Sequence, residues 1–312
     1  MFALGLQKDY AGLLWLMLLF SLMYAPTLAL TNSIALSNMV DSGREFGWIR
    51  VFGTLGWIAA GWTLSAWRNW LPTLPGDMLF LAGGFAIILG VFSLALPDTP
   101  PKREGANPLA FLEALALFRN RSFVVFMLIS FVVGTELEFY YILTSPYLEH
   151  LGVAPANVPF VMSIAQIAEI AVMAVLLPVL LPKLGTRRLL AWGVIAWPIR
   201  YAIFAFLPIT WVVAASLALH GFCYVFFFVV GFIYVDRIAP KDIRASAQAL
   251  VAIVVLGGGR FLGSRFAGWT KAFFTSDGPT NWQMVFLVPC VLTVVCALAF
   301  LLFFREEKTT QP

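Results

Sequence analysis

Charged residues are scarce in this chain of 312 residues. Asp, Glu, Lys and Arg make up 12% of the sequence, whereas apolar residues make up 61% and the mean hydropathy is +0.89. A soluble domain of this length needs far more charge to cover its surface. The scarcity of charge therefore excludes an ordinary soluble enzyme or binding domain.

Cysteine is also scarce. The chain has three cysteines, Cys223, Cys290 and Cys296, and all of them lie inside apolar runs. An odd number in such positions supports neither a disulfide framework nor a metal site, so we expect small packing residues. No apolar run holds a nucleophile together with its base, or a set of metal ligands. We therefore expect no enzyme activity and no cofactor.

The apolar residues are gathered in long runs. Tyr10–Leu36 and Trp282–Phe304 exceed the roughly 20 residues that span a bilayer's hydrocarbon. Lipid cannot satisfy an open strand edge, so helices are expected. We predict an all-α, polytopic membrane helix bundle. Its nine predicted spans are residues 11–39, 47–68, 77–96, 122–147, 157–181, 187–207, 210–235, 244–270 and 282–304.

Lys and Arg are distributed unevenly between these spans. One side of the predicted membrane has only Lys8, Arg68 and Lys271. The positive-inside rule makes the other side cytoplasmic, which places the C-terminus inside. The net charge of +4 reflects this topology, and we expect no nucleic-acid partner. The cations on the predicted cytoplasmic side are Arg44, Lys102, Arg103, Arg119, Arg121, Lys183, Arg187, Arg188, Arg237, Lys241, Arg305 and Lys308.

The longest polar connection runs from Pro97 to Asn120. Its prolines and charges favour a boundary between two helical bundles. We predict three helices in residues 1–96, a cytoplasmic central loop at 97–121 and a six-helix bundle in 122–312.

Polar residues inside the spans carry the candidate chemistry, because an ionisable group at mid-membrane costs about 2.5–3.5 kcal/mol. Arg50, Thr54 and Trp57 follow i, i+4, i+7 spacing and share one helix face. A cation, a hydroxyl and an indole on one stripe suit a polar, partly aromatic ligand. In an alternative interpretation, Arg50 extends to the lipid headgroups.

A second candidate group lies in the fourth span. Glu138 and Tyr141 are one turn apart, whereas Glu136 lies about 200° round the helix from Glu138. We expect only one of the two glutamates to face the transport path. Alternatively, they pair with Arg200 or Arg260 and hold helices together.

A third candidate group lies in the fifth span, where Gln166 and Glu169 are one turn apart in an apolar stretch. A carboxyl withdrawn from water can take up and release protons near neutrality, as proton-coupled transport requires. We interpret His220 as a hydrogen-bond donor between helices rather than a proton relay. Gly257–Gly259 interrupt an apolar span with no preceding strand, which favours close packing or a hinge over a phosphate loop.

Six segments of the chain occur in a recognisable order. They are Tyr24–Leu28 with Thr31–Ser33, Ile49–Gly56, Gly134–Leu137, Ser163–Glu169, Ala196–Arg200 and Ile243–Gln248. In register, these six segments resemble the nucleoside:proton symporter family of the major facilitator superfamily. The resemblance places the first of them in the family's fourth helix and the next three in the fifth, seventh and eighth.

The resemblance implies a twelve-helix fold made of two halves. The nine spans would match helices 4 to 12, so residues 1–96 would be the remainder of the N-terminal bundle. Three helices would then be missing, either from a short gene model or because the protein is a remnant.

The resemblance also implies ligand-contacting residues. It places Arg50, Thr54, Gln166 and Glu169 at such positions and retains an aromatic residue at Trp57. The chain departs from the family pattern elsewhere. Glu138 and Tyr141 replace amides of the seventh helix, and Val225 replaces an acidic residue of the tenth.

We therefore predict a monomeric, multi-pass transporter of the bacterial inner membrane. It would move a small polar solute, a nucleoside, together with protons by alternating access within the lipid bilayer. Arg50, Thr54, Trp57, Glu138, Tyr141, Gln166 and Glu169 would contact the solute, and Glu169 would carry the proton. Two alternatives are a transporter for a sugar or other polar metabolite, and a shortened protein that acts as a sensor or partner.

Overall fold

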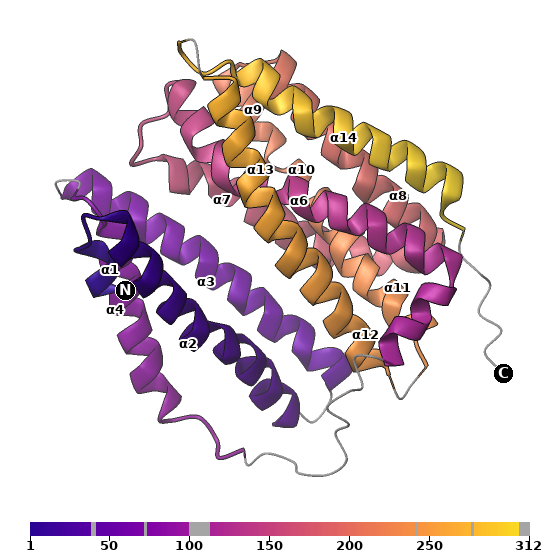
Figure 1. The fold of residues 1–312 in the computed structure, drawn as a ribbon. Helices are drawn as coiled ribbons and strands as arrows, with labels where there is room; N and C mark the ends of the chain where they lie inside the picture. Colours follow the sequence, from indigo (N-terminus) through magenta and orange to yellow (C-terminus); the bar gives the residue numbers. More distant parts are fainter. Residues whose placement is uncertain (39–41, 72–73, 100–112, 241–242, 276–277, 306–312) are drawn as a thin grey trace. The chain divides into compact units, whose positions relative to one another are not determined.

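The computed structural model is helical throughout the residues that it describes, which are 1–38, 42–71, 74–99, 113–240, 243–275 and 278–305 (Figure 1). The chain divides into two compact units, Met1–Glu104 (unit 1) and Gly105–Pro312 (unit 2). Within the described residues, six helical segments are long and apolar enough to cross a membrane. They are Tyr10–Thr27, Arg121–His150, Val158–Phe206, Thr210–Ile238, Ser246–Phe273 and Trp282–Phe303.

Unit 1 consists of α1 (Phe2–Gly5), α2 (Tyr10–Ser37), α3 (Ser42–Trp70) and α4 (Asp77–Ser93). The carboxylate of Asp9 begins α2 by accepting a hydrogen bond from the Gly12 amide at 2.7 Å. A bidentate ion pair joins the end of α3 to the start of α4, because Nε and Nη2 of Arg68 each donate to Asp77 at 2.7 Å. Over their described residues, the three spans predicted before the central loop are thus helical apart from the turns at residues 38 and 94–96.

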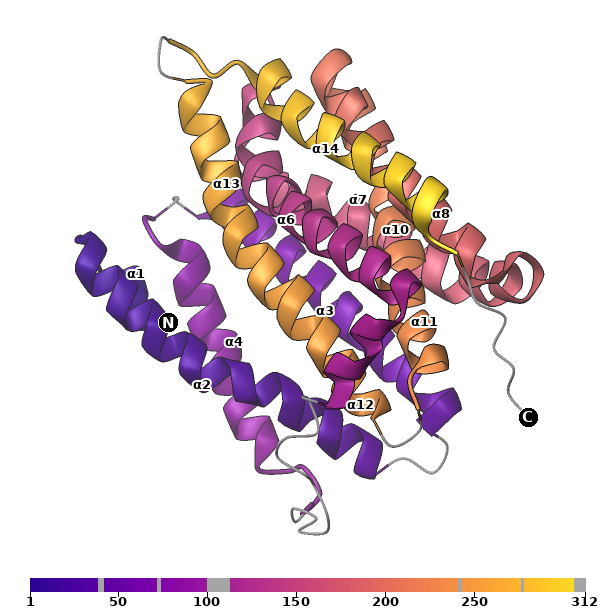
Figure 2. The ribbon, with the colours of Figure 1, turned by 45° about the vertical axis from the view of Figure 1, so that its right-hand side comes forward.

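Five of the six membrane-length segments belong to unit 2, and one of these five, Val158–Phe206, is interrupted within its length. The central loop predicted at 97–121 lies mostly outside the described residues, apart from a short 3₁₀ turn, η1 (Leu115–Arg119). Figures 1 and 2 show α13 alongside α6 and α14 alongside α8. The helices of unit 2 are α6 (Arg121–His150), α7 (Val158–Ala171), α8 (Leu177–Phe206), α9 (Thr210–Ser216), α10 (Leu219–Cys223), α11 (Val230–Ile238), α12 (Arg244–Val251), α13 (Arg260–Phe273) and α14 (Trp282–Phe303).

The 49-residue segment Val158–Phe206 is interrupted at Gly185. Gly185 has φ 74° and ψ 171°, a backbone conformation that glycine adopts without a steric penalty. An unbroken helix of this length would measure about 74 Å, more than twice the thickness of the hydrocarbon core. The interruption falls between the predicted spans 157–181 and 187–207.

Three stretches of π-helix lie within the spans of unit 2. They are η2 (Val172–Leu176), η3 (Tyr224–Val229) and η4 (Ala252–Gly259). The sequence did not indicate them. Such stretches are frequent at functional sites, and here η2 and η3 begin a few residues after Glu169 and His220.

The core of unit 2 is aromatic. Tyr147 of α6, Phe204 of α8 and Phe286 of α14 are all buried, and the ring centroids of Tyr147 and Phe204 lie 4.8 and 5.0 Å from that of Phe286. The Tyr147 hydroxyl donates to the Phe204 carbonyl at 2.6 Å. These contacts join α6, α8 and α14. Cys223, Cys290 and Cys296 are buried in this unit.

Candidate functional site

Helix α6 approaches α13, and the π-helix η4 that precedes it, at the level of their backbones. A Cβ atom on Gly263 would lie 2.4 Å from the Thr135 carbonyl oxygen, and one on Gly134 would lie 2.7 Å from the Val255 carbonyl oxygen. Only glycine allows this spacing. It brings α13 close enough for Arg260 to reach Glu138 on α6.

Glu138, Tyr141 and Arg260 form one end of a polar cluster in unit 2. Arg260 Nε donates to Glu138 Oε1 at 2.5 Å, and the Arg260 guanidinium lies 5.0 Å from the centre of the Tyr141 ring. The helix pairing that the sequence left open is thus confirmed for Glu138 with Arg260. Glu138 and Tyr141 lie on one face of α6, as their spacing predicts.

Glu136 occupies a different environment from Glu138. It is fully buried, and neither carboxyl oxygen has a hydrogen-bond partner among the described residues. The Tyr201 hydroxyl donates to its backbone carbonyl at 2.5 Å. No ion pair between Glu136 and Arg200 is found in the described part of the chain. The hypothesis that these two residues pair to hold helices together is therefore wrong.

Arg200 is fully buried among aromatic rings. Its guanidinium lies 4.6 Å from the centres of the Tyr140 and Trp197 rings and 5.1 Å from that of Tyr201. No carboxylate of the described residues lies within 4.0 Å of it. Cation–π attraction therefore replaces an ion pair in stabilising this charge. One of these ring contacts could be predicted from the sequence, because Trp197 and Arg200 are spaced one helical turn apart.

His220 connects Arg200 to the fifth predicted span. Arg200 Nη1 lies 3.1 Å from His220 Nδ1, and His220 Nε2 lies 4.0 Å from Glu169 Oε2. Arginine has no acceptor, so His220 accepts in this bond. His220 thus takes part in a hydrogen bond between helices, as predicted, and in this bond with Arg200 it is the acceptor. The donor role predicted for His220 stays a prediction.

Gln166 and Glu169 lie one turn apart on α7, as expected. Gln166 is buried, and the Glu169 side chain is 13% exposed. The Tyr141 and His220 rings meet edge to face at 6.2 Å, which joins the two ends of the group. We call Glu138, Tyr141, Glu169, Arg200, His220 and Arg260 the polar cluster.

The remaining predicted site residues belong to α3 in unit 1. Thr54 is half-buried and Trp57 is 63% exposed. Both lie on one helix face, one turn apart. Arg50 lies in the same helix, but its side chain is outside the described residues.

The three consecutive glycines are not equivalent. A Cβ on Gly259 would lie 3.1 Å from the Phe131 carbonyl oxygen, whereas one on Gly257 or Gly258 would meet nothing nearer than 3.7 Å. Close helix packing therefore explains Gly259 alone.

Membrane-length helices around buried charges are typical of a polytopic membrane transporter. The family described as "Nucleoside H+ symporter" matches residues 1–309, and the chain belongs to this family. The predicted family is confirmed, and this family and the relatives named below are transporters rather than enzymes.

Two relatives from Escherichia coli (strain K12) resemble nearly the whole chain. The "Putative nucleoside transporter YegT" is 36% identical over 96% of this chain and 74% of its own length. The "Nucleoside permease NupG" is 30% identical over 94% of this chain and 74% of its own length. The crystal structure of the nucleoside transporter NupG matches with a TM-score of 0.83 at 28% identity, over 98% of this chain and 80% of that one.

Proposed function

We propose that this chain transports a nucleoside across the bacterial inner membrane in symport with protons, by alternating access. The observation that carries the proposal is the polar cluster, in which a nearly buried carboxyl, Glu169, lies one helical turn from the buried amide of Gln166, inside a membrane-length segment. The family and the names of its relatives support the nucleoside as solute.

We propose nine membrane crossings, equivalent to helices 4 to 12 of the twelve-helix fold. The interruption at Gly185 divides the longest segment into two, and α3 and α4 add two to the remaining ones. The domain division proposed is a three-helix remainder at 1–96, a central loop at 97–121 and a six-helix bundle at 122–312.

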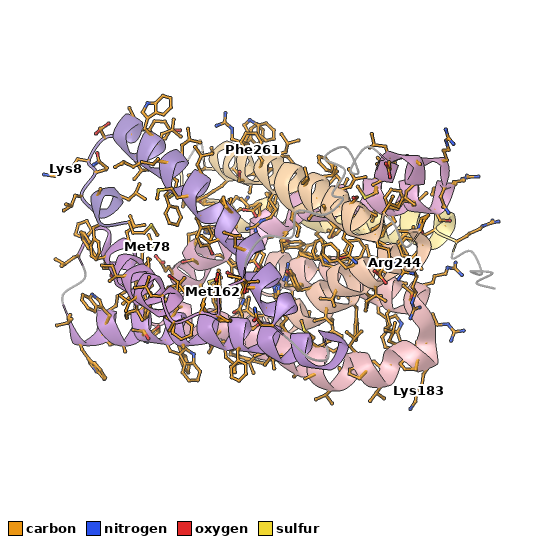
Figure 3. All side chains as sticks on the ribbon, turned by 90° about the horizontal axis from the view of Figure 1, so that it is seen from below. Lys8, Met78, Met162, Lys183, Arg244 and Phe261 are labelled. Atoms are coloured by element: carbon orange, nitrogen blue, oxygen red, sulfur yellow. The ribbon has the colours of Figure 1, made fainter. Side chains whose placement is uncertain are left out.

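The proposed orientation has the C-terminus in the cytoplasm, and the proposed active form is a monomer. Figure 3 shows Lys183 and Arg244 toward the same end of unit 2. Arg237 also donates to Thr186 at 2.7 Å. This bond brings the connection near Lys183 together with the connection that precedes Arg244. A shared end for these cations supports a single cytoplasmic face.

The proposed solute contacts are the residues that the sequence and its family resemblance indicate. Arg50, Thr54 and Gln166 would hydrogen-bond the solute, and Trp57 would stack on its base. In the polar cluster, Arg260 Nε donates a hydrogen bond to Oε1 of Glu138. The second carboxylate oxygen and the Tyr141 hydroxyl would remain for the solute.

Glu169 is the proposed proton carrier, and Glu169→Gln tests this role. The amide keeps the size of the side chain but cannot exchange a proton. Accumulation of labelled uridine against a gradient should be abolished in proteoliposomes, while exchange of labelled for unlabelled uridine continues. Glu149→Gln, which changes an exposed glutamate at the end of α6, is the matched control. Undiminished accumulation by Glu169→Gln would contradict the coupling role.

Competition of uptake by unlabelled solutes tests the solute class. Nucleosides in excess should block uptake, and sugars should not. Block by sugars alone would favour the metabolite transporter. Absence of any saturable uptake would favour a sensor or partner.

A further inference from the structure

The His220 ring is held in a slot between two tyrosines. It stacks on Tyr140 at 4.6 Å with 21° between the ring planes, and on Tyr224 at 5.6 Å with 25°. The edge of Tyr141 closes a third side at 6.2 Å. His220 is fully buried. Its ring plane is therefore fixed by packing before any hydrogen bond is considered.

The bond with Arg200 determines which nitrogen of His220 carries the proton. A guanidinium can only donate, so Nδ1, 3.1 Å from Arg200 Nη1, presents its lone pair. The imidazole is then neutral, with its proton on Nε2. Nε2 is buried and has no hydrogen-bond partner among the described residues, and Glu169 Oε2 lies 4.0 Å from it.

Gly221 sets the distance between the two helices at this point. A Cβ there would lie 2.6 Å from the Ala168 carbonyl oxygen and 3.0 Å from the Glu169 amide nitrogen. Helix α10 therefore packs against the α7 backbone directly beside Glu169. A closure of about 1 Å would turn the 4.0 Å separation of Nε2 and Oε2 into a hydrogen bond.

Two arginines of the described residues lie near this pair. Arg200 on α8 contacts His220, and Arg260 on α13 contacts Tyr141, whose ring meets that of His220. Arg260 is already paired with Glu138. The charge of Arg200 reaches Glu169 through His220, because the imidazole lies between them.

We propose that His220 is the positioning residue for proton coupling. Arg200 binds Nδ1 and thereby presents Nε2–H to Glu169. When Glu169 releases its proton to water, the carboxylate accepts a hydrogen bond from Nε2–H. The imidazole keeps its own proton throughout. This inference rests on the proposed role of Glu169 as the proton carrier.

A matched pair of substitutions at His220 tests the proposal. The amide nitrogen of His220→Gln can take the place of Nε2, whereas that of His220→Asn reaches only the place of Nδ1. A hydrogen bond to an ionised carboxylate favours the ionised form, so its loss moves proton release to higher pH. We expect its loss to shift the pH of proton release by about one unit or more.

The measurement is the pH dependence of labelled uridine uptake by the full chain in proteoliposomes. His220→Asn should move the pH of half-maximal uptake upward by about one unit, and His220→Gln should stay near the parent value. A purely structural role would lower uptake equally at every pH. An unmoved midpoint in His220→Asn, or an equal shift in both variants, would overturn the proposal.

Glu169→Gln, assayed in parallel, separates the two proposals. If Glu169 carries the proton, this variant loses the pH dependence. If it keeps the parent profile, the proposed coupling fails, whatever the His220 variants do.

A second measurement does not depend on variants at the site. The chain has only two histidines, so ¹⁵N NMR of the imidazoles can be assigned with His150→Gln. We expect an unprotonated Nδ1 and a protonated Nε2 for His220. The opposite tautomer, or a doubly protonated ring at neutral pH, would overturn the proposal.

Discussion

The two units differ in where their stabilising contacts lie. In unit 1, Ile58 of α3 is among the few buried apolar side chains, and large residues such as Phe85 and Trp57 are exposed. In unit 2, Tyr147 and Phe286 belong to an extensive aromatic core. Substitutions of equal size should therefore cost much more in unit 2. The same packing holds the polar cluster in one geometry.

Two phenylalanines give the largest expected contrast. Phe286 in unit 2 is fully buried, whereas Phe85 in unit 1 is 41% exposed. Phe286→Ala should cost about 3–5 kcal/mol, because it leaves a cavity among aromatic rings. Phe85→Ala should cost less than about 1 kcal/mol. Thermal unfolding in detergent, followed by tryptophan fluorescence, measures both. Equal losses would contradict the contrast between units.

Glycines at helix contacts sharpen the comparison. In Gly263→Ala the new methyl would lie 2.4 Å from the Thr135 carbonyl oxygen, so α6 and α13 must separate. We expect a loss of about 3 kcal/mol. Gly90→Ala in unit 1 meets no atom within 4 Å and should stabilise α4 by up to about 1 kcal/mol.

Gly268→Ala is the control for the Gly263 prediction within the same helix. Its Cβ also meets nothing within 4 Å. A loss for Gly268→Ala as large as that for Gly263→Ala would show that general helix effects, not the α6 contact, are responsible.

The ion pairs of the two units should differ in function rather than in stability. Asp77→Asn breaks the pair with Arg68, and Glu138→Gln breaks the pair with Arg260. Each should cost about 1.5–2 kcal/mol of unfolding free energy. Glu138→Gln should in addition lower uridine uptake about tenfold, because Glu138 belongs to the polar cluster. Initial uptake rates at equal protein amounts provide the measurement, and equal uptake by both variants would contradict a solute role for Glu138.

Single hydroxyl groups give the smallest expected difference. Tyr147→Phe removes a buried bond to the Phe204 carbonyl in unit 2 and should cost about 1 kcal/mol. The Thr63 hydroxyl donates to the Ala59 carbonyl within its own helix at 2.8 Å. Thr63→Val in unit 1 should therefore change stability by less than about 0.5 kcal/mol. Melting temperatures that fall equally would show that the helices of unit 1 depend on such bonds as much as unit 2 does.

Helix positions in unit 2 could be predicted from the sequence, because local signals mark them. The span predicted at 122–147 is Arg121–His150, and the span at 282–304 is Trp282–Phe303. Asn120 and Asn281 begin these two helices, since each side chain accepts hydrogen bonds from the first-turn amides. Gly185, in a polar break between two apolar runs, interrupts the longest helical segment.

Contacts between helices could not be predicted in the same way. Spacing placed Glu138 and Tyr141 on one face, but Arg260 is 122 residues from Glu138 along the chain. Their pairing depends on the close approach at Gly134 and Gly263. The acceptor role of His220 likewise depends on Arg200, which lies on another helix. Helical periodicity carries no information on either contact.

Proton movement during uptake tests the central claim most directly. Proteoliposomes that hold the full chain and a trapped pH-sensitive dye are exposed to uridine without an imposed gradient. The account predicts that the interior acidifies as uridine enters, and that Glu169→Gln abolishes the acidification while Glu149→Gln preserves it. Uridine entry without acidification, or an unchanged signal in Glu169→Gln, would contradict proton coupling through the polar cluster.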